Sequence, residues 1–407
     1  MKRSIDAALL AGAMSIGAAA LYGGAAFAQT PVKIGVLSDM SGPYSDFGGQ
    51  GSLEAAKLAV EDFNAGSKKL SVEIVSADAQ NKPDVATAIA RRWFDTDNVD
   101  MVVDIPTSGI ALGLAGLVKE KNKVLIATTA GTSELTGKSC TPNTLHWTWD
   151  TWSNSHGTAE AVVRSGGKSW YFLTADYTFG TTMEKEAGEV VKANGGTVLG
   201  SVRHPLDAKD FSSFLLQAQN SKAQIIGLAN GGTDTINAIK TAGEFGIVAG
   251  GQKLAGLVIF INDIHALGLQ KANGLLLTTA YYWDLNDRTR AFAERFAKRN
   301  NGKVPSMSQA GTYSSTLAYL RAVEKVGNAK DGAAIVAAMR EAGTYDDPLF
   351  GKTSVRADGR VVHDMYLVEV KKPEESKKPF DYYRIVATIP ADRAFRPLSE
   401  GNCPLAK

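Results

Sequence analysis

The sequence contains few of the residues from which metal and redox centres are built. Its 407 residues include two cysteines, Cys140 and Cys403, and five scattered histidines. Neither cysteine belongs to a C-x-x-C pair, and the histidines do not show the spacing of a zinc site. We therefore expect no cofactor and no metal.

The sequence also lacks an excess of charge of one sign and lacks the common catalytic motifs. Lys and Arg number 44, Asp and Glu number 42, and the formal net charge is +2, which argues against nucleic acid as a partner. The motifs G-x-S-x-G and H-E-x-x-H are absent, and the glycines at 49 and 51 are not followed by the third glycine of a dinucleotide fingerprint. These absences favour binding over catalysis, so we do not expect an enzyme.

Only the N-terminus has a long apolar run. Lys2 and Arg3 precede an apolar stretch over residues 7–25, which ends in Ala26-Phe27-Ala28. This pattern predicts a signal peptide over residues 1–28 that is removed on export to the periplasm, the alternative being a transmembrane anchor. In an oxidising compartment Cys140 and Cys403 are expected to form a disulfide, the alternative being two buried thiols.

Short β-branched runs alternate with helical periods through most of the chain. The expected strands are 34–37, 72–76, 100–104, 123–127, 169–173, 196–200, 224–228, 254–261, 364–370 and 382–387. The expected helices are 53–63, 84–94, 109–119, 179–193, 210–220, 233–245, 289–299, 310–326 and 331–342. Such alternation predicts an α/β protein with two doubly wound, parallel-sheet lobes.

The lobes are expected to be discontinuous in sequence. Residues 29–148 and 284–350 are assigned to the first lobe, and residues 149–283 and 351–407 to the second, with a C-terminal tail that returns toward the first. Trp149, Tyr281, Tyr282 and Trp283 then lie near the junction, where their rings either line a site for a flat ligand or pack the lobes together.

Loops at the carboxyl ends of the strands carry the candidate binding residues, because ligands of open parallel sheets gather at that edge. In the first lobe, a glycine-rich loop with Tyr44 and Phe47 leaves room for a small molecule, and hydroxyl clusters at 107–108 and 128–132 suit a carboxylate. In the second lobe, the corresponding loops offer aromatic walls and acids that suit an ammonium or hydroxyl group. N-capping and core packing are the alternatives. The candidates are Tyr44, Phe47, Thr107, Ser108, Thr129, Ala130, Gly131, Asp176, Tyr177, Phe179, Asn230 and Asp263.

Four stretches resemble a known family over essentially the whole mature chain. "VKIGVLSDMSGPYSDFGGQG", "NKVLIATTAGTSELTG" followed by "CTPNTLHW", "TADYTFG" and "DFSSFLLQAQNSKAQIIGLA" are similar to periplasmic solute-binding proteins of ABC importers of the branched-chain amino acid (Leu/Ile/Val) type. The resemblance implies a type I periplasmic binding protein, with two lobes joined by three crossovers, that closes on a ligand and delivers it to an ABC permease.

The resemblance also implies site residues. It places the ligand carboxylate at residues 107–108 and 129–131 and aromatic walls at Phe47 and Phe179. The chain departs from the family where Asn230-Gly231 replaces a common Tyr, and the nearest acid for a ligand ammonium is Asp263.

We therefore expect a monomeric periplasmic protein that captures a small carboxylate-bearing solute, such as a branched-chain or other amino acid, with no nucleic acid partner. An aromatic acid, another organic acid or an amide is the alternative ligand. A ligand-dependent sensor that docks a receptor is the alternative function.

Overall fold

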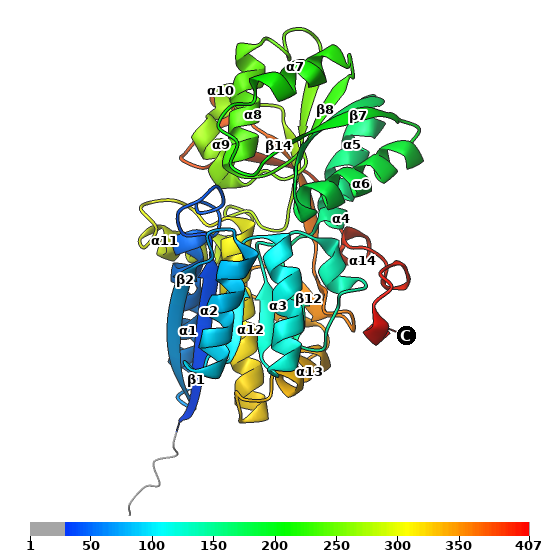
Figure 1. Ribbon diagram of the computed structural model, residues 1–407. Coiled ribbons are helices and arrows are strands. Elements are labelled where there is room, and N and C mark those ends of the chain that lie inside the picture. The colour runs from blue at the N-terminus through cyan, green and yellow to red at the C-terminus, as the bar shows by residue number, and fades with distance from the viewer. Residues whose placement is uncertain (1–28, 407) are drawn as a thin grey trace, which may run out of the picture.

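The computed structural model describes residues 29–406, so the predicted signal peptide lies outside the described residues. Within that range no helix combines the length and apolarity needed to cross a bilayer. Figure 1 shows two lobes stacked one above the other, with the C-terminus beside the lower one.

The first lobe is built on a five-stranded parallel sheet of order β2-β1-β3-β4-β5. Its strands are β1 (Thr30–Ser38), β2 (Leu70–Asp78), β3 (Met101–Asp104), β4 (Val124–Ala127) and β5 (Thr144–His146). The inner strands β3 and β4 are buried at every position, as expected for strands that are covered on both faces.

Helices cover both faces of this sheet, as Figure 1 shows. They are α1 (Gly49–Gly66), α2 (Pro83–Asp95), α3 (Ser108–Glu120), α12 (Met307–Val326) and α13 (Gly332–Glu341). In β3, Met101 and Val103 belong to the core that includes α1 and α12, whereas Val102 belongs to the core with α2 and α3. Alternate side chains of β3 therefore pack into different cores on the two faces of the sheet.

The second lobe contains a four-stranded parallel sheet of order β7-β6-β8-β9. Its strands are β6 (Ser169–Ala175), β7 (Thr197–His204), β8 (Ile225–Ala229) and β9 (Lys253–Gly256). Its helices are α4 (Thr151–Asn154), α5 (Glu160–Arg164), α6 (Thr178–Ala193), α7 (Ser212–Asn220), α8 (Thr233–Glu244), α9 (Ile261–Leu267) and α10 (Leu269–Ala272). A π-helical turn, Ser155–Ala159, connects α4 and α5.

One strand of this sheet is shorter than the sequence predicts. The apolar run 254–261 was expected to be a strand throughout, but β9 ends at Gly256 and α9 begins at Ile261. The chain folds back at Gly256, where a side chain would collide with Ile259, and the Asp263 carboxylate accepts the Phe260 N–H at 2.8 Å. A short apolar run does not distinguish a strand from a buried turn.

A third sheet and a small ribbon complete the fold. The strands β10 (Leu276–Thr279), β14 (Met365–Val370) and β15 (Tyr383–Ile389) form an antiparallel sheet of order β10-β14-β15, and β11 (Tyr345–Asp347), β12 (Gly351–Val355) and β13 (Val361–Val362) form an antiparallel ribbon. The remaining helices are α11 (Asp287–Ala297) and α14 (Ala391–Ala394), with 3-10 turns at Ser133–Thr136, Pro373–Glu375, Leu398–Glu400 and Pro404–Ala406.

The ribbon lies beside the first sheet, because Arg360 forms a parallel bridge with His146 at the end of β5. Residues 351–362, which the sequence analysis assigned to the second lobe, therefore pack against the first. Short strands in a ribbon leave too little periodicity to place them from sequence.

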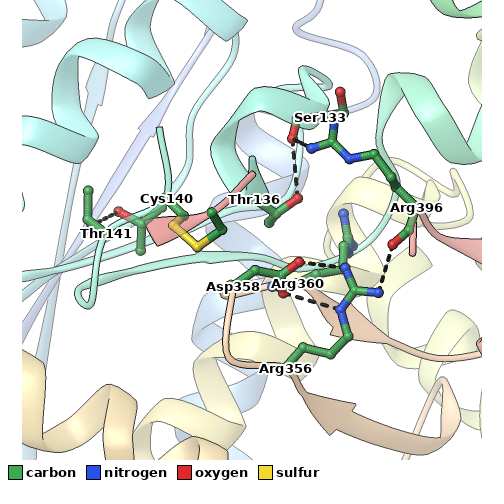
Figure 2. Close-up of a disulfide and its surroundings, with 10 residues drawn as sticks. Ser133, Thr136, Cys140, Thr141, Arg356, Asp358, Arg360 and Arg396 are labelled. Atoms are coloured by element: carbon green, nitrogen blue, oxygen red, sulfur yellow. Dashed lines mark hydrogen bonds and ion pairs between the residues drawn. A yellow bond between two sulfur atoms is a disulfide. The ribbon is translucent and has the colours of Figure 1, made fainter. Parts of the chain in front are cut away.

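The predicted disulfide is confirmed. Cys140 and Cys403 are bonded with their Cα atoms 5.7 Å apart, although 263 positions separate them in sequence. Figure 2 shows this bridge beside hydrogen bonds that hold the returning tail: Arg396 Nη2 donates to the Ser133 carbonyl at 2.8 Å, and Arg356 Nη1 donates to the Arg396 carbonyl at 2.8 Å. The disulfide and these hydrogen bonds therefore fix the C-terminal tail to the first lobe.

Candidate functional site

A cavity of about 20 Å³, room for about one water molecule, lies between the loops at the carboxyl ends of the two parallel sheets. Thirteen residues line it: Tyr44, Phe47, Pro106, Thr107, Ser108, Thr129, Gly131, Trp149, Tyr177, Phe179, Gly231, Val258 and Phe260. Eight of them are predicted site residues. None of these thirteen carries a formal charge, and six of them are aromatic.

The loop that leaves β3 is strained where it reaches the cavity. Asp104 and Ile105 both have left-handed backbone conformations, with φ of +83° and +63°. Such conformations cost about 1–3 kcal/mol per residue and are common at ligand sites. Here they lead the chain into Pro106, Thr107 and the start of α3 at Ser108.

The start of α3 offers donors to the cavity. Thr107 precedes the helix but its side chain makes no capping bond, and Ser108 Oγ accepts the Thr132 N–H at 3.2 Å. Within residues 29–406, the Thr107 and Ser108 hydroxyl protons and the Ala130 and Gly131 N–H groups have no acceptor. Free donors at a positive helix end suit an anion.

Thr129 is hydrogen-bonded to a buried carboxylate. The hydroxyls of Thr129, Thr128 and Ser38 donate to Asp104, the Thr128 bond being 3.2 Å long. Burial raises the pKa of Asp104, and the hydrogen bonds from Ser38 and Thr129 oppose that rise. The carboxylate thus ties β1, β3 and the loop after β4 together beneath the cavity.

Aromatic rings from both lobes meet around the cavity. Phe47 of the first lobe stacks on Phe260 of the second, with centroids 3.9 Å apart and planes 11° apart. Trp149 meets Phe179 and Phe260 edge-on, at 6.1 and 5.9 Å. A side chain at Gly131 would come within 2.5 Å of the Trp149 ring, so this close approach requires glycine.

Trp149 also carries an unused donor. Its side chain is 2% exposed, and its Nε1 is buried with no hydrogen-bond partner in the described part of the chain. An unpaired buried N–H costs about 1–3 kcal/mol, which a ligand acceptor would relieve.

Polar contacts between the lobes border the rings. The Tyr44 and Tyr177 hydroxyls are hydrogen-bonded to each other, and burial raises the pKa of both phenols. The Thr233 N–H donates to the Pro43 carbonyl at 3.3 Å, which joins the same two lobes. These contacts describe a closed arrangement of the lobes.

Two of the predicted residues, Ala130 and Asp263, do not line the cavity but form hydrogen bonds within their own lobes. The Ala130 carbonyl accepts the His146 Nε2–H at 2.7 Å. Burial, followed by the nearby Arg360, lowers the pKa of His146 to about 3, so its ring is neutral at pH 7. Asp263 caps α9 through the Phe260 N–H instead of facing a ligand.

The other two predicted residues outside the lining also have partners within the second lobe. Asp176 is exposed and pairs with Arg203 at 3.4 Å. The Asn230 amide contacts His204 Nε2 at 3.0 Å and accepts the Thr235 hydroxyl at 2.6 Å. The structure therefore places none of the three predicted second-lobe residues Asp176, Asn230 and Asp263 in the lining.

Five lining residues were not among the sequence candidates: Pro106, Trp149, Gly231, Val258 and Phe260. Val258 and Phe260 were hidden by the overlong strand prediction, since the end of a strand marks where site residues begin. For Trp149 and Gly231, the residue type alone does not distinguish a residue that lines a site from one that packs in the core. Tyr281, Tyr282 and Trp283, the alternative flat-ligand residues, do not belong to the lining.

Two parallel-sheet lobes that close around an internal cavity define a bilobal ligand-binding protein. The sequence matches the model of the periplasmic binding protein family over residues 31–378, and the chain belongs to that family. The resemblance to binding proteins of the branched-chain amino acid type is confirmed.

Three similar proteins show how widely the likeness extends. A periplasmic binding protein from Burkholderia mallei is 51% identical, with a TM-score of 0.89 over 93% of this chain and 100% of that one. A branched-chain amino acid ABC transporter periplasmic ligand-binding protein from Burkholderia xenovorans is 41% identical, with a TM-score of 0.80 over 92% and 100%. The Leu/Ile/Val-binding protein homolog 6 of Brucella melitensis is 27% identical over 87% of this chain and 91% of its own length.

Proposed function

We propose that this protein captures a small aromatic carboxylic acid between its lobes in the periplasm and delivers it unchanged to the permease of an ABC importer. The observation that carries the ligand class is a lining of six aromatic side chains, hydroxyls and free amides, with no charged side chain among its residues.

The carboxylate is proposed to bind at the start of α3. The Ser108 hydroxyl, the Gly131 amide and the indole N–H of Trp149 belong to lining residues and lack acceptors within residues 29–406. Hydrogen bonds to an ionised group are about twice as strong as neutral ones, so the carboxylate of the ligand gains most from these donors.

The aromatic body of the ligand is proposed to lie among the rings. Phe47, Trp149, Phe179 and Phe260 line the cavity and contact one another through ring faces and ring edges. Edge-to-face and offset contacts contribute about 0.5–1.5 kcal/mol per pair beyond the burial of area. In this closed arrangement the cavity measures about 20 Å³, room for about one water molecule, so the proposal requires the lobes to part before a substituted ring can enter.

An amino acid fits this lining less well. Its ammonium group would need a carboxylate or several acceptors, and the acids offered by the sequence analysis, Asp176 and Asp263, do not line the cavity. Burying an unpaired cation is strongly unfavourable. The branched-chain amino acid expectation therefore gives way to its alternative, the aromatic acid.

The fold accommodates such acids elsewhere. A solute-binding protein from Rhodopseudomonas palustris, 24% identical with a TM-score of 0.79 over 89% of this chain, was crystallised with p-hydroxybenzoic acid. At this identity the likeness concerns the fold, so the ligand class rests on the lining described above.

Isothermal titration of the purified mature protein tests the proposal. Benzoate and hydroxybenzoates are compared with leucine, isoleucine and valine, and a thermal-shift assay provides a second readout because a ligand of the native state raises its melting temperature. We expect a benzoate to bind at least tenfold more tightly than the amino acids and to be recovered unchanged. Tighter binding of leucine would overturn the ligand class, and conversion of the bound acid would overturn the binding role.

A further inference from the structure

The two hydroxyl clusters of the first lobe differ in where their protons go. The Ser108 and Thr107 hydroxyls have no acceptor within residues 29–406, whereas the Thr129 hydroxyl donates to Asp104. A hydroxyl has one proton and two lone pairs. Any ligand group that reaches Thr129 Oγ therefore meets an oxygen that can accept but has no proton left to give.

Asp104 is built into the fold as an acceptor. It is fully buried. Ser38 Oγ accepts the Gly49 N–H at 2.7 Å and donates its own proton to Asp104. The Thr128 hydroxyl also donates to Asp104. Its backbone carbonyl accepts the N–H groups of Thr128 and Thr129 at 3.0 and 3.1 Å. These bonds fix both the carboxylate and the Thr129 backbone, so the Thr129 hydroxyl has one favoured orientation.

We infer that Asp104 is a positioning residue that makes Thr129 a hydrogen-bond acceptor in the cavity, so that the ligand carries an O–H or N–H donor in addition to its carboxylate. The inference rests on the proposed function and narrows it to hydroxy- or amino-substituted aromatic acids. It also separates the two clusters: residues 107–108 donate to the carboxylate, and Thr129 accepts from the ring substituent.

Matched ligands test this assignment. Hydroxybenzoate and aminobenzoate carry a donor, whereas fluorobenzoate is similar in size and carries none; each is titrated with the substituent at the 3- and the 4-position. For wild type, we expect the donor-bearing acid to bind about three- to tenfold more tightly than the fluoro acid at one of the two positions, the range that one hydrogen bond supplies.

Variants locate the acceptor. Thr129→Val keeps the shape of the side chain and removes the oxygen, so the ratio of the two affinities should fall within twofold, whatever the change in fluorobenzoate affinity. Thr129→Ser retains the hydroxyl and should keep the preference. Asp104→Asn leaves three hydroxyl donors competing for one oxygen, so the preference should shrink, but not when Thr129→Val is also present. A merely structural role of Asp104 would shift all affinities together and leave these ratios unchanged.

The outcomes are distinguishable. If fluorobenzoates bind but wild type shows no preference for a donor, or if the preference survives Thr129→Val and is lost in Tyr177→Phe, the inference is wrong and the proposed function stands. If no benzoate binds, both are wrong. Should Asp104→Asn not fold, the two Thr129 variants still decide the question.

Discussion

The two sheet edges that face the cavity occupy equivalent places in their lobes but present different side chains to it. In the first lobe, the edge presents Thr107, Ser108 and Thr129 beside free backbone amides. In the second lobe, it presents rings and small apolar groups, of which Phe179 and Phe260 contact the Trp149 ring. The proposed function uses this difference: the polar end of the ligand is proposed to bind the first lobe, and its ring to lie among the aromatic side chains of both lobes.

The second lobe is not poor in polar residues, but it uses them internally. Asn230 is engaged by His204 and Thr235, and Asp263 caps its own helix. A buried polar group that already has partners has little to offer a ligand. The comparison therefore depends on hydrogen-bond partners rather than on composition.

The largest expected effect comes from breaking a buried ion pair between Asp150, just before α4, and Arg360, which bridges to the end of β5. Arg360 is fully buried, and its Nη1 lies 3.2 Å from the Asp150 carboxylate and 3.3 Å from the Trp149 carbonyl. Arg360→Leu leaves the Asp150 charge buried without its partner, which should lower the free energy of unfolding by about 3–5 kcal/mol.

Urea denaturation followed by circular dichroism measures this loss. Arg288 is the matched control, because it also pairs with an aspartate, Asp346, but on the surface. Arg288→Leu should have little effect, since exposed pairs contribute little. Equal losses in the two variants would show that the buried pair contributes no more to stability than the exposed pair does.

The second prediction concerns an acid of the second lobe that reaches across to the first, outside the cavity. Glu186 of α6 accepts the Ser133 hydroxyl at 2.5 Å. Burial raises the pKa of Glu186 to about 7, and the negative charge of Asp150 adds to this rise. The hydrogen bonds from Ser133 and Thr151 and the positive charge of Arg396 act in the opposite direction.

Because this folded-state pKa lies above the value of about 4.3 for an unfolded glutamate, the native state binds more protons between these two pH values. The free energy of unfolding therefore decreases as the pH rises from about 4.5 to 7, because the buried carboxyl group is then forced to ionise. The difference in the free energy of unfolding between Glu186→Gln and wild type should therefore increase, in favour of the variant, by about 2 kcal/mol from pH 5 to pH 8. Urea titrations at each pH measure this difference.

Asp234 and Asp263, whose pKa values burial also raises to about 7, remain in both proteins, so the difference isolates Glu186. Glu189→Gln, an exposed change on the same helix, is the control. A constant difference between Glu186→Gln and wild type across this pH range would contradict the assignment.

The smallest expected effect sharpens the comparison at equivalent positions. Ser108 and Thr178 are both first residues of a helix that follows a sheet strand, one in each lobe, but only Ser108 lines the cavity. Ser108→Ala should weaken benzoate binding about tenfold through loss of a charge-assisted bond. Thr178→Ala should leave affinity within twofold by titration calorimetry. Equal effects would mean that the polar end of the ligand is not confined to the first lobe.

Local sequence determined the elements with strong periodicity. The helices at 49–66, 83–95 and 178–193 and the strands at 30–38 and 169–175 all overlap their predicted ranges. Turn chemistry and hydroxyl clusters also located the first-lobe edge, because ligands of open parallel sheets gather at the carboxyl ends of the strands. The cysteine pair followed from there being only two cysteines in a chain that the sequence predicts to be exported.

Only the tertiary structure decided which candidates face the cavity. Asp176, Asn230 and Asp263 belong to the right loops, yet their hydrogen-bond partners are brought to them by folding and draw them away from the lining. Phe260 and Trp149 enter the lining because a strand ends early and because Gly131 permits a close approach. Sequence fixes propensity over a few neighbouring residues, whereas the direction of a side chain depends on packing and hydrogen bonding between segments far apart in the chain.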